Sequence, residues 1–253
     1  MDFFPFELLN QEHQRIIAGA AQSAVTLRLL GALAFELRCP RQASLRKELG
    51  RQLSDLDYMS LTRQWDQVVS LITSLGYSFD ERRAMLHGHD RLIFFHPEGL
   101  RVDVFFDRLD MCHNLDLRER LDVHDQTISL ADLLLEKLQI VHITEKDIID
   151  MIALFLEYPL SMDEQGINAS YISNRFAWDW GFYYTARTNL LRLRDEFLPA
   201  YTQLTDADRR TLHDRISALL ERIEAAPKTA RWKVRQEIGA SVKWYKDVGD
   251  LIR

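Results

Sequence analysis

The spacing of apolar residues changes near the middle of the chain and divides it into two parts. Up to about residue 110, short apolar runs bounded by turn residues alternate with runs of helical spacing, which is typical of strands mixed with helices. Beyond Ser129, nearly every apolar run repeats at three or four residues. We therefore predict an α+β fold, with a small mixed sheet flanked by helices in residues 1–128 and an all-helical part in residues 129–253.

The first part contains apolar runs that predict three strands and two helices, with two segments left open. The strands are expected at 54–61, 91–96 and 100–106 and the helices at 10–24 and 64–75. The run 25–30 fits a strand or the end of a helix, and 32–38 fits either a helix or a strand. Pro97, Glu98 and Gly99 form a turn signal that makes the last two strands a hairpin. In the final strand, a period of two places Arg101 and Asp103 on one face and most apolar residues on the other.

The second part predicts a series of helices with clear start and stop signals. Capping residues at Ser129, Thr144 and Thr205 each precede an acid three positions later, and Pro159 and Pro227 end two of the apolar stripes. The helices are expected at about 130–142, 145–158, 168–197, 206–226 and from 230 onward.

Charge and composition narrow the classes of protein that fit. The chain of 253 residues has a net charge of −6, which excludes a globally basic nucleic-acid coat but not a local basic face. Two cysteines, Cys39 and Cys112, are too few for a disulfide framework and suit a reducing compartment. The sequence shows neither an apolar run long enough to span a membrane nor the basic start of a signal peptide, so we expect a cytoplasmic protein.

Asp55 and Asp57 are the first candidates for chemistry. On a strand, residues i and i+2 point to the same side with Cα atoms roughly 6.5–7 Å apart, so the two carboxylates share one face. A cation between them would favour both staying ionised, and oxygen ligands of this kind suit Mg²⁺. The alternative is a strand end with two solvated acids.

Asp103 adds a third carboxylate within a strand that is otherwise apolar enough to be central in a sheet. A buried carboxylate is unfavourable unless it is paired or bound to a metal. An ion pair with Arg91 or Arg101 would satisfy it, and so would a metal. A third strand acid after an Asp-x-Asp strand is the pattern that a two-metal phosphoryl-transfer site needs.

Lysines are rare in this chain, with 7 of them against 25 arginines, and two fall in the middle. Lys137 lies within the apolar stripe of the helix predicted at 130–142, where it either extends to the surface or reaches a cleft that holds anions. Lys146, Asp147 and Asp150 open the next helix. The alternatives to a functional site are an ordinary surface ion pair between Lys146 and Asp150, at i,i+4 spacing, and a capping role for Asp147.

Taken in order, these residues resemble the nucleotidyltransferase (DNA polymerase β) superfamily over about half of the chain. The resemblance is closer to the toxin-type nucleotidyltransferases of abortive-infection systems. It rests on Gly31 after an apolar run, Asp55-x-Asp57, Asp103 in LRVDVFF, Lys137 in LLLEKLQI and the segment EKDIIDM.

The resemblance implies a site in which Mg²⁺, or Mn²⁺ in its place, is held by Asp55, Asp57 and Asp103. It implies that Lys137 contacts the phosphates of an NTP. The other residues implied to contact the nucleotide or support the site are Gly31, Ala32, Ser54, Lys146, Asp147 and Asp150. The family has Gly-Ser where this chain has Gly31-Ala32, so only backbone N–H groups could cradle phosphate there.

The C-terminal segment 228–246 combines basic and aromatic residues. It carries six lysines and arginines against one acid, including four of the seven lysines, with Trp232, Trp244 and Tyr245 interleaved. Such a segment could bind a phosphate backbone and stack bases, or it could be a docking helix whose aromatic residues lie in the core. The residues expected to contact an RNA such as tRNA are Lys233, Arg235, Lys243 and Trp244.

Two classes of function follow from these observations. The first is a Mg²⁺-dependent nucleotidyltransferase that moves a nucleoside monophosphate from an NTP to an acceptor hydroxyl, in the toxin-type case with an antitoxin partner. The second is a fold of the same kind that has lost catalysis and senses nucleotides or binds protein. His87 and His89 are more typical of a loop than of a metal site, and Cys112-His113 is expected to be structural.

Overall fold

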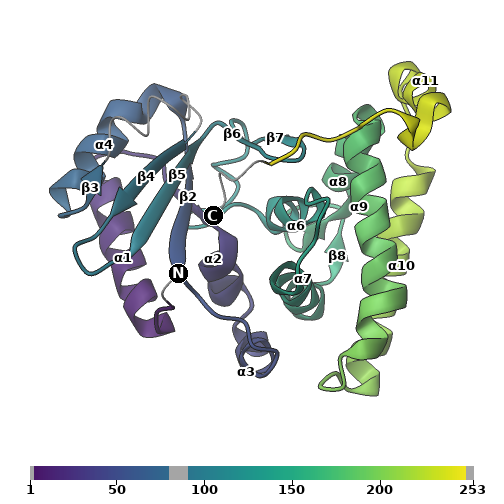
Figure 1. Cartoon of the computed structure of the whole chain (residues 1–253), viewed down its shortest axis with the longest axis horizontal. Coiled ribbons are helices and arrows are strands. Elements are labelled where there is room, and N and C mark those ends of the chain that lie inside the picture. The colour runs from purple at the N-terminus through teal and green to yellow at the C-terminus, as the bar shows by residue number, and fades with distance from the viewer. Residues whose placement is uncertain (1–2, 80–90, 249–253) are drawn as a thin grey trace. The chain divides into compact units, whose positions relative to one another are not determined.

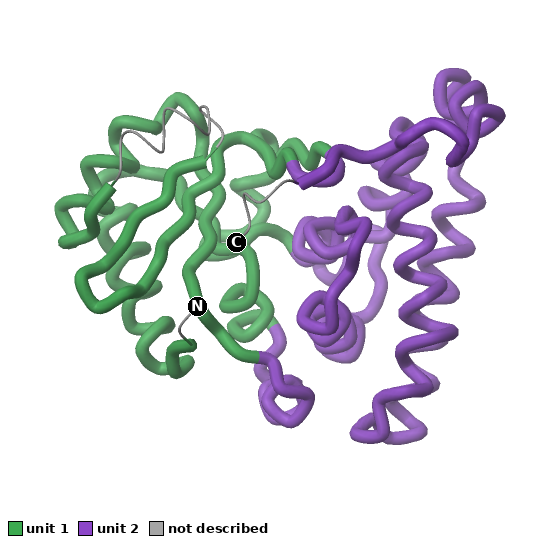
Figure 2. Tube along the Cα trace, viewed as in Figure 1, with its two compact units in different colours: residues 1–38, 52–110, 114–129 green, residues 39–51, 111–113, 130–253 purple. Residues whose placement is uncertain are grey.

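The computed structural model describes residues 3–79 and 91–248. It has the α+β architecture, with an N-terminal mixed sheet flanked by helices and a mostly helical C-terminal part (Figure 1). Two compact units can be distinguished (Figure 2). The sheet unit consists of residues 1–38, 52–110 and 114–129, and the helical unit consists of residues 39–51, 111–113 and 130–253.

The sheet unit is built on five strands in the order β1-β2-β5-β4-β3. The central pair, β2 and β5, is parallel, and the other three pairs are antiparallel. The strands are β1 (Arg28–Leu30), β2 (Asp55–Ser60), β3 (Ser78–Phe79), β4 (Arg91–Phe95) and β5 (Arg101–Phe106). A small hairpin follows, formed by β6 (Arg108–Asp110) and β7 (Asn114–Asp116).

One face of this sheet is apolar and covered by helices. Leu56 and Tyr58 of β2 and Val102 and Val104 of β5 are fully buried on it. Helix α1 (Phe6–Gln22) packs there, with His13 Nδ1 2.9 Å from the Tyr58 hydroxyl, and α4 (Trp65–Ser74) packs against α1. Because side chains alternate along a strand, the charged residues of β2 and β5 point to the opposite face.

The helical unit surrounds α6 (Leu130–Leu138), in which all nine residues are buried. A short parallel pair, β8 (Leu160–Ser161) and β9 (Ile167–Asn168), follows α7 (Glu145–Glu157). The remaining helices of this unit are α3 (Ala43–Glu48), α7 (Glu145–Glu157), α8 (Ala169–Trp178), α9 (Trp180–Arg192), α10 (Asp206–Ala225) and α11 (Ala230–Ile238).

Most predicted elements are present, and the open segment at 32–38 is helix α2 (Gly31–Arg38). The capping boxes at Thr144 and Thr205 are confirmed by reciprocal side-chain and backbone hydrogen bonds. Among the residues that the structure describes, no helix is both long enough and apolar enough to cross a membrane.

The segment 168–197 is helical as predicted, and it is divided at Asp179, whose side chain accepts a hydrogen bond from the Phe182 N–H and caps α9. Two helix predictions were wrong in extent. The helix predicted from residue 230 ends at Ile238, where Gly239 adopts a φ of +59° that a right-handed helix does not allow. Helix α6 ends at Leu138, before His142.

Candidate metal centre

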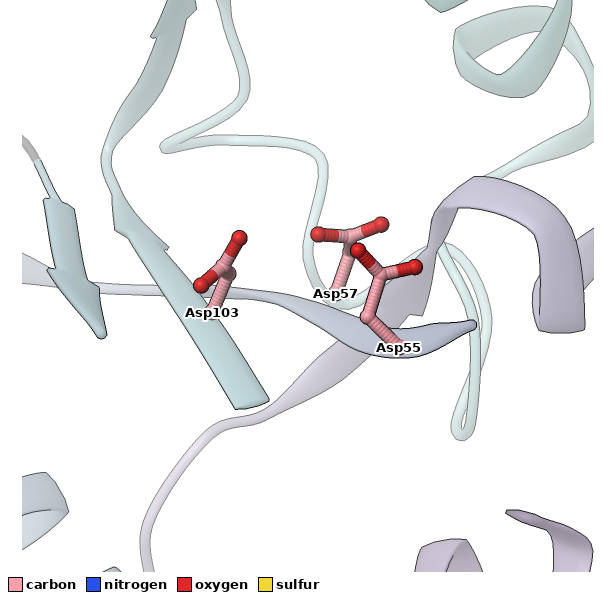
Figure 3. A group of neighbouring side chains, drawn as sticks. All are labelled: Asp55, Asp57 and Asp103. Carbon is pink, nitrogen blue, oxygen red and sulfur yellow. The ribbon is translucent and has the colours of Figure 1, made fainter. Parts of the chain in front are cut away.

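Three aspartates meet on the polar face of the sheet. Asp57 and Asp103 are directly opposite each other in the parallel pairing of β2 and β5, and Asp55 lies two residues before Asp57. One carboxylate oxygen from each lies within 4.8 Å of the others. Figure 3 shows the three side chains rising from the same side of the two strands. The prediction that the three acids gather is therefore confirmed.

Asp103 is the deepest member of this triad, and its surroundings are unusual for a carboxylate. Its exposed fraction is 0%, and its Oδ2 accepts hydrogen bonds from both Arg91 and Arg101, the latter at 2.8 Å. Its Oδ1 is buried and has no hydrogen-bond partner among the described residues. Burial raises the pKa of Asp103 above its ordinary value of 3.8, although the two guanidiniums oppose that shift.

The Oδ1 of Asp103 is a buried acceptor that a ligand could satisfy. A buried acceptor without a partner is unfavourable by about 1–3 kcal/mol, so native proteins rarely retain one without a reason. Three carboxylates within reach of one point are an oxygen-only donor set, which suits Mg²⁺, Mn²⁺ or Ca²⁺ rather than a softer metal. The residues therefore fit a divalent cation, held by Asp55, Asp57 and Asp103.

Gly31 brings the start of α2 against the triad. Its φ is +68°, and a Cβ atom added there would lie 2.4 Å from Asp57 Oδ2, which is closer than any side chain tolerates. The first backbone N–H groups of a helix have no intrahelical acceptor and favour anions. Gly31 and Ala32 thus begin this helix beside Asp57, a member of the triad. Ser54 lies at the edge, and its hydroxyl donates to Asp55 Oδ1 at 2.9 Å.

Lys137 belongs to the helical unit and is buried, so of the two alternatives for its side chain the extension to the surface is excluded, and the predicted contact with phosphates stays a prediction. Its side chain is about 8% exposed, and its Nζ lies 3.1 Å from Glu136, 3.5 Å from Asp147 and 3.3 Å from Asp150. Burial alone would lower the pKa of Lys137, but these carboxylates outweigh it and raise the pKa above its ordinary value. The ammonium is held in a buried ionic cluster.

Asp150 is the centre of that cluster, and its burial excludes the surface pair with Lys146 that was the alternative to a site role. Its oxygens accept from Arg46 at 2.9 Å and from Arg51 at 2.8 Å, and its exposed fraction is 0%. Burial raises the pKa of Asp150, but Lys137 and the two arginines reverse that effect and hold it at about 2. Asp147 closes the cap of α7 with Thr144, while Lys146 is exposed.

The C-terminal segment divides between the core and the surface. Trp232 is buried, and Trp244 donates from Nε1 to the Thr185 hydroxyl at 3.0 Å. Arg235 donates to two backbone carbonyls and lies 4.5 Å from the Trp180 ring centroid. Lys233 and Lys243 are exposed, and Lys243 is paired with Asp247. The aromatic residues Trp232 and Trp244 therefore pack within the helical unit.

The sequence analysis missed two partners of Asp150, and the remaining histidine and cysteine candidates lie outside the triad. Arg46 and Arg51 were not identified, because nothing in a run of basic residues reveals a partner about 100 positions away. His113 is structural, with Nε2 2.8 Å from the Thr185 hydroxyl. Cys39 and Cys112 are free thiols. His87 and His89 lie outside the described residues.

No model of a known protein family matches this chain, and a comparison with curated proteins finds no similar sequence either. What the molecule itself provides is a mixed five-stranded sheet with helices and an acidic triad able to bind a metal ion.

Proposed function

We propose that this protein is a Mg²⁺-dependent nucleotidyltransferase whose active site is the triad of Asp55, Asp57 and Asp103. The observation that carries the proposal is the coincidence of two features at one point. Three carboxylates converge on a position for a divalent cation, with one buried oxygen left without a partner. The N-terminus of α2 begins against the same Asp57 through a glycine that leaves no room for a side chain.

Metal and phosphate sites side by side are what phosphoryl transfer requires, because the metal neutralises charge on the phosphates while backbone amides orient them. When bound, Mg²⁺ would supply that neutralisation and acidify the acceptor hydroxyl. The backbone of Gly31 and Ala32 would hold a terminal phosphate. Asp103, whose pKa is raised by burial, is the carboxylate suited to accept the proton of the attacking hydroxyl.

In the reaction, the acceptor oxygen forms a bond to the α-phosphorus of the NTP and the bond to pyrophosphate breaks. Lys137 has no part in this step as we propose it, since its ammonium already contacts three carboxylates in the helical unit. The acceptor is proposed to be an RNA such as tRNA. Exposed Lys233 and Lys243 in the basic C-terminal segment support that choice.

A second function has one specific observation in its favour. Arg91 and Arg101 already neutralise one oxygen of Asp103, as they would in a protein that uses the fold without a metal. Such a protein would bind a nucleotide or another protein without catalysis. The two functions differ in whether binding needs a divalent cation.

The test combines nucleotide binding with transfer. Thermal unfolding is followed with each NTP, with and without Mg²⁺, and a ligand at 100 times its Kd is expected to add about 2.7 kcal/mol of stability. Transfer of label from α-labelled NTP to RNA is measured in parallel. Asp103→Asn should abolish the Mg²⁺-dependent shift and the transfer. Asp66→Asn, which changes an exposed acid of the same unit, should alter neither.

A shift that persists without Mg²⁺ and in Asp103→Asn would favour the second function. No shift with any NTP would contradict the nucleotidyltransferase and leave, of the second function, only the binding of another protein. The transfer assay alone decides whether RNA is the acceptor, because the labelled nucleotide would then be found attached to the RNA.

A further inference from the structure

Five charged side chains share the polar face of the sheet, and their order follows from strand register. In β2 and β5, Asp55 is directly opposite Arg101 and Asp57 is directly opposite Asp103. Arg91 of β4 reaches the same group and donates to Asp103 Oδ2. The two arginines are therefore part of the site and not a remote surface feature.

Arg101 bridges the two strands through a single nitrogen. Its Nη2 lies 3.2 Å from Asp55 Oδ2 and 2.8 Å from Asp103 Oδ2. It therefore lies between two of the three carboxylates that a metal would use. A divalent cation and this guanidinium compete for Asp55, because both need the same negative charge at close range.

The balance of charge shows what this competition can achieve. Three carboxylates and two guanidiniums leave the face with one net negative charge, which attracts a divalent cation. Once that cation is bound, the face carries one net positive charge and attracts an anion. Without the arginines, the metal-loaded triad would remain negative and would repel a polyphosphate. The arginines thus make the site suited to an anionic ligand only after metal binding.

We propose that Arg101 is a substrate-binding residue that moves its guanidinium from Asp55 to phosphate oxygens when a divalent cation takes its place. The inference rests on the proposed function and adds the order in which the ligands bind, with the metal first and a polyphosphate second. Arginine suits this exchange because its planar donors match carboxylate and phosphate oxygens equally well.

The contacts of Arg91 differ from those of Arg101, and they indicate that Arg101 is the arginine that moves to the phosphate. The Arg91 guanidinium lies 4.9 Å from the centroid of the Phe105 ring and forms an ion pair with Asp103, whereas Arg101 divides its ion pairs between Asp103 and Asp55. Arg91 therefore remains as a counter-ion for Asp103, which is fully buried, after Arg101 leaves. Asp103 is not left as an uncompensated buried charge, which would be strongly unfavourable.

The experiment measures two affinities that should change in opposite directions. Mn²⁺ binding to the protein alone is followed by electron paramagnetic resonance, and binding of inorganic tripolyphosphate is followed by calorimetry with Mn²⁺ in excess. In Arg101→Gln, the Mn²⁺ affinity should rise about fivefold, because the competing cation is gone, and the tripolyphosphate affinity should fall at least tenfold. Arg101→Lys keeps the charge, so its Mn²⁺ affinity should equal that of the wild type and part of the tripolyphosphate affinity should return.

Arg63→Gln is the matched control, since it removes an exposed positive charge from the same unit and should change neither affinity. Loss of both affinities in Arg101→Gln with an unchanged Arg101→Lys would indicate a structural role for the charge and overturn the inference. Unchanged affinities in Arg101→Gln would overturn it too.

The inference and the proposed function fail in different ways. If the wild type binds Mn²⁺ and Asp103→Asn does not, the metal site stands whatever Arg101 does. If the wild type binds no Mn²⁺, both are overturned.

Discussion

Two fully buried aspartates, Asp103 in the sheet unit and Asp150 in the helical unit, differ in how their charge is balanced. Asp150 accepts hydrogen bonds at both oxygens, from Arg46 and Arg51, and its pKa is held at about 2. Asp103 accepts at one oxygen only, and its pKa is raised. The two side chains are equally buried, yet the pKa of Asp150 is lowered and the pKa of Asp103 is raised.

The difference separates a structural cluster from a candidate ligand site. The oxygens of Asp150 are satisfied by the protein itself, so this acid holds α3 and α6 against α7. The Oδ1 of Asp103 has no partner among the described residues, and Asp103 lies beside two further carboxylates that could hold a metal ion with it. Counting hydrogen bonds at each buried acid distinguishes the two better than burial or proximity of charges does.

The largest effect on stability should come from Asp150→Asn. Removing this charge leaves Arg46, Arg51 and Lys137 buried around a neutral group, at an expected cost of about 3–5 kcal/mol in the free energy of unfolding. Asp103→Asn should cost less, because burial already disfavours ionised Asp103 and its two arginine partners are partly exposed. Urea unfolding of both variants measures the contrast, and equal costs would refute it.

A second prediction concerns pH. Because the folded-state pKa of Asp150, about 2, lies below its ordinary value of 3.8, its contribution is fully present above about pH 4 and is lost as the pH falls towards 2. That contribution is roughly 2 kcal/mol. The difference in unfolding free energy between the wild type and Asp150→Asn should therefore shrink by this amount between about pH 5 and pH 2. A difference independent of pH would show that Asp150 is not a low-pKa acid.

A third prediction tests the contact between α2 and the triad. In Gly31→Ala, the new Cβ would displace the Asp57 carboxylate, and Mn²⁺ affinity should fall about tenfold, or 1.4 kcal/mol. Gly50→Ala is the matched control. Its φ of +79° imposes the same kind of backbone strain, but nothing lies within 4 Å of the added Cβ, so metal binding should be unchanged. Equal losses in both variants would mean that strain, not contact with Asp57, is responsible.

The smallest effect is expected for Lys146→Ala. Lys146 is exposed on the first turn of α7, one position before the buried Asp147, so its removal should change the free energy of unfolding by less than about 0.5 kcal/mol. Thermal unfolding checks this. A loss above 2 kcal/mol would place Lys146 in the buried cluster after all.

The sequence predicted the triad because its signals are local. Asp55 and Asp57 share a face by strand periodicity alone, and Asp103 is conspicuous as a charge among apolar strand residues. The ion pair of Asp103 with Arg91 and Arg101, considered as the alternative to a metal, is also present, so the two explanations describe parts of one site.

The ionic cluster could not be predicted, because it depends on long-range packing. Arg46 and Arg51 contact Asp150 from about 100 positions away, and no periodicity links them. The prediction of a helix through the C-terminal segment was wrong for a different reason. Its composition favours a continuous helix, but one residue, Gly239, takes a backbone conformation that ends the helix.

The division into units has a consequence for dissecting this protein by truncation. Six consecutive segments alternate between the units, so the chain passes from one to the other five times and no single cut can release either (Figure 2). A fragment that begins at Leu130 would lack Arg46 and Arg51, which balance Asp150, and Cys112, whose carbonyl accepts from the Lys246 N–H. Each unit thus contains segments that are interleaved in the sequence with segments of the other unit. Point substitutions in the intact chain are therefore the way to assign roles to the residues of either unit.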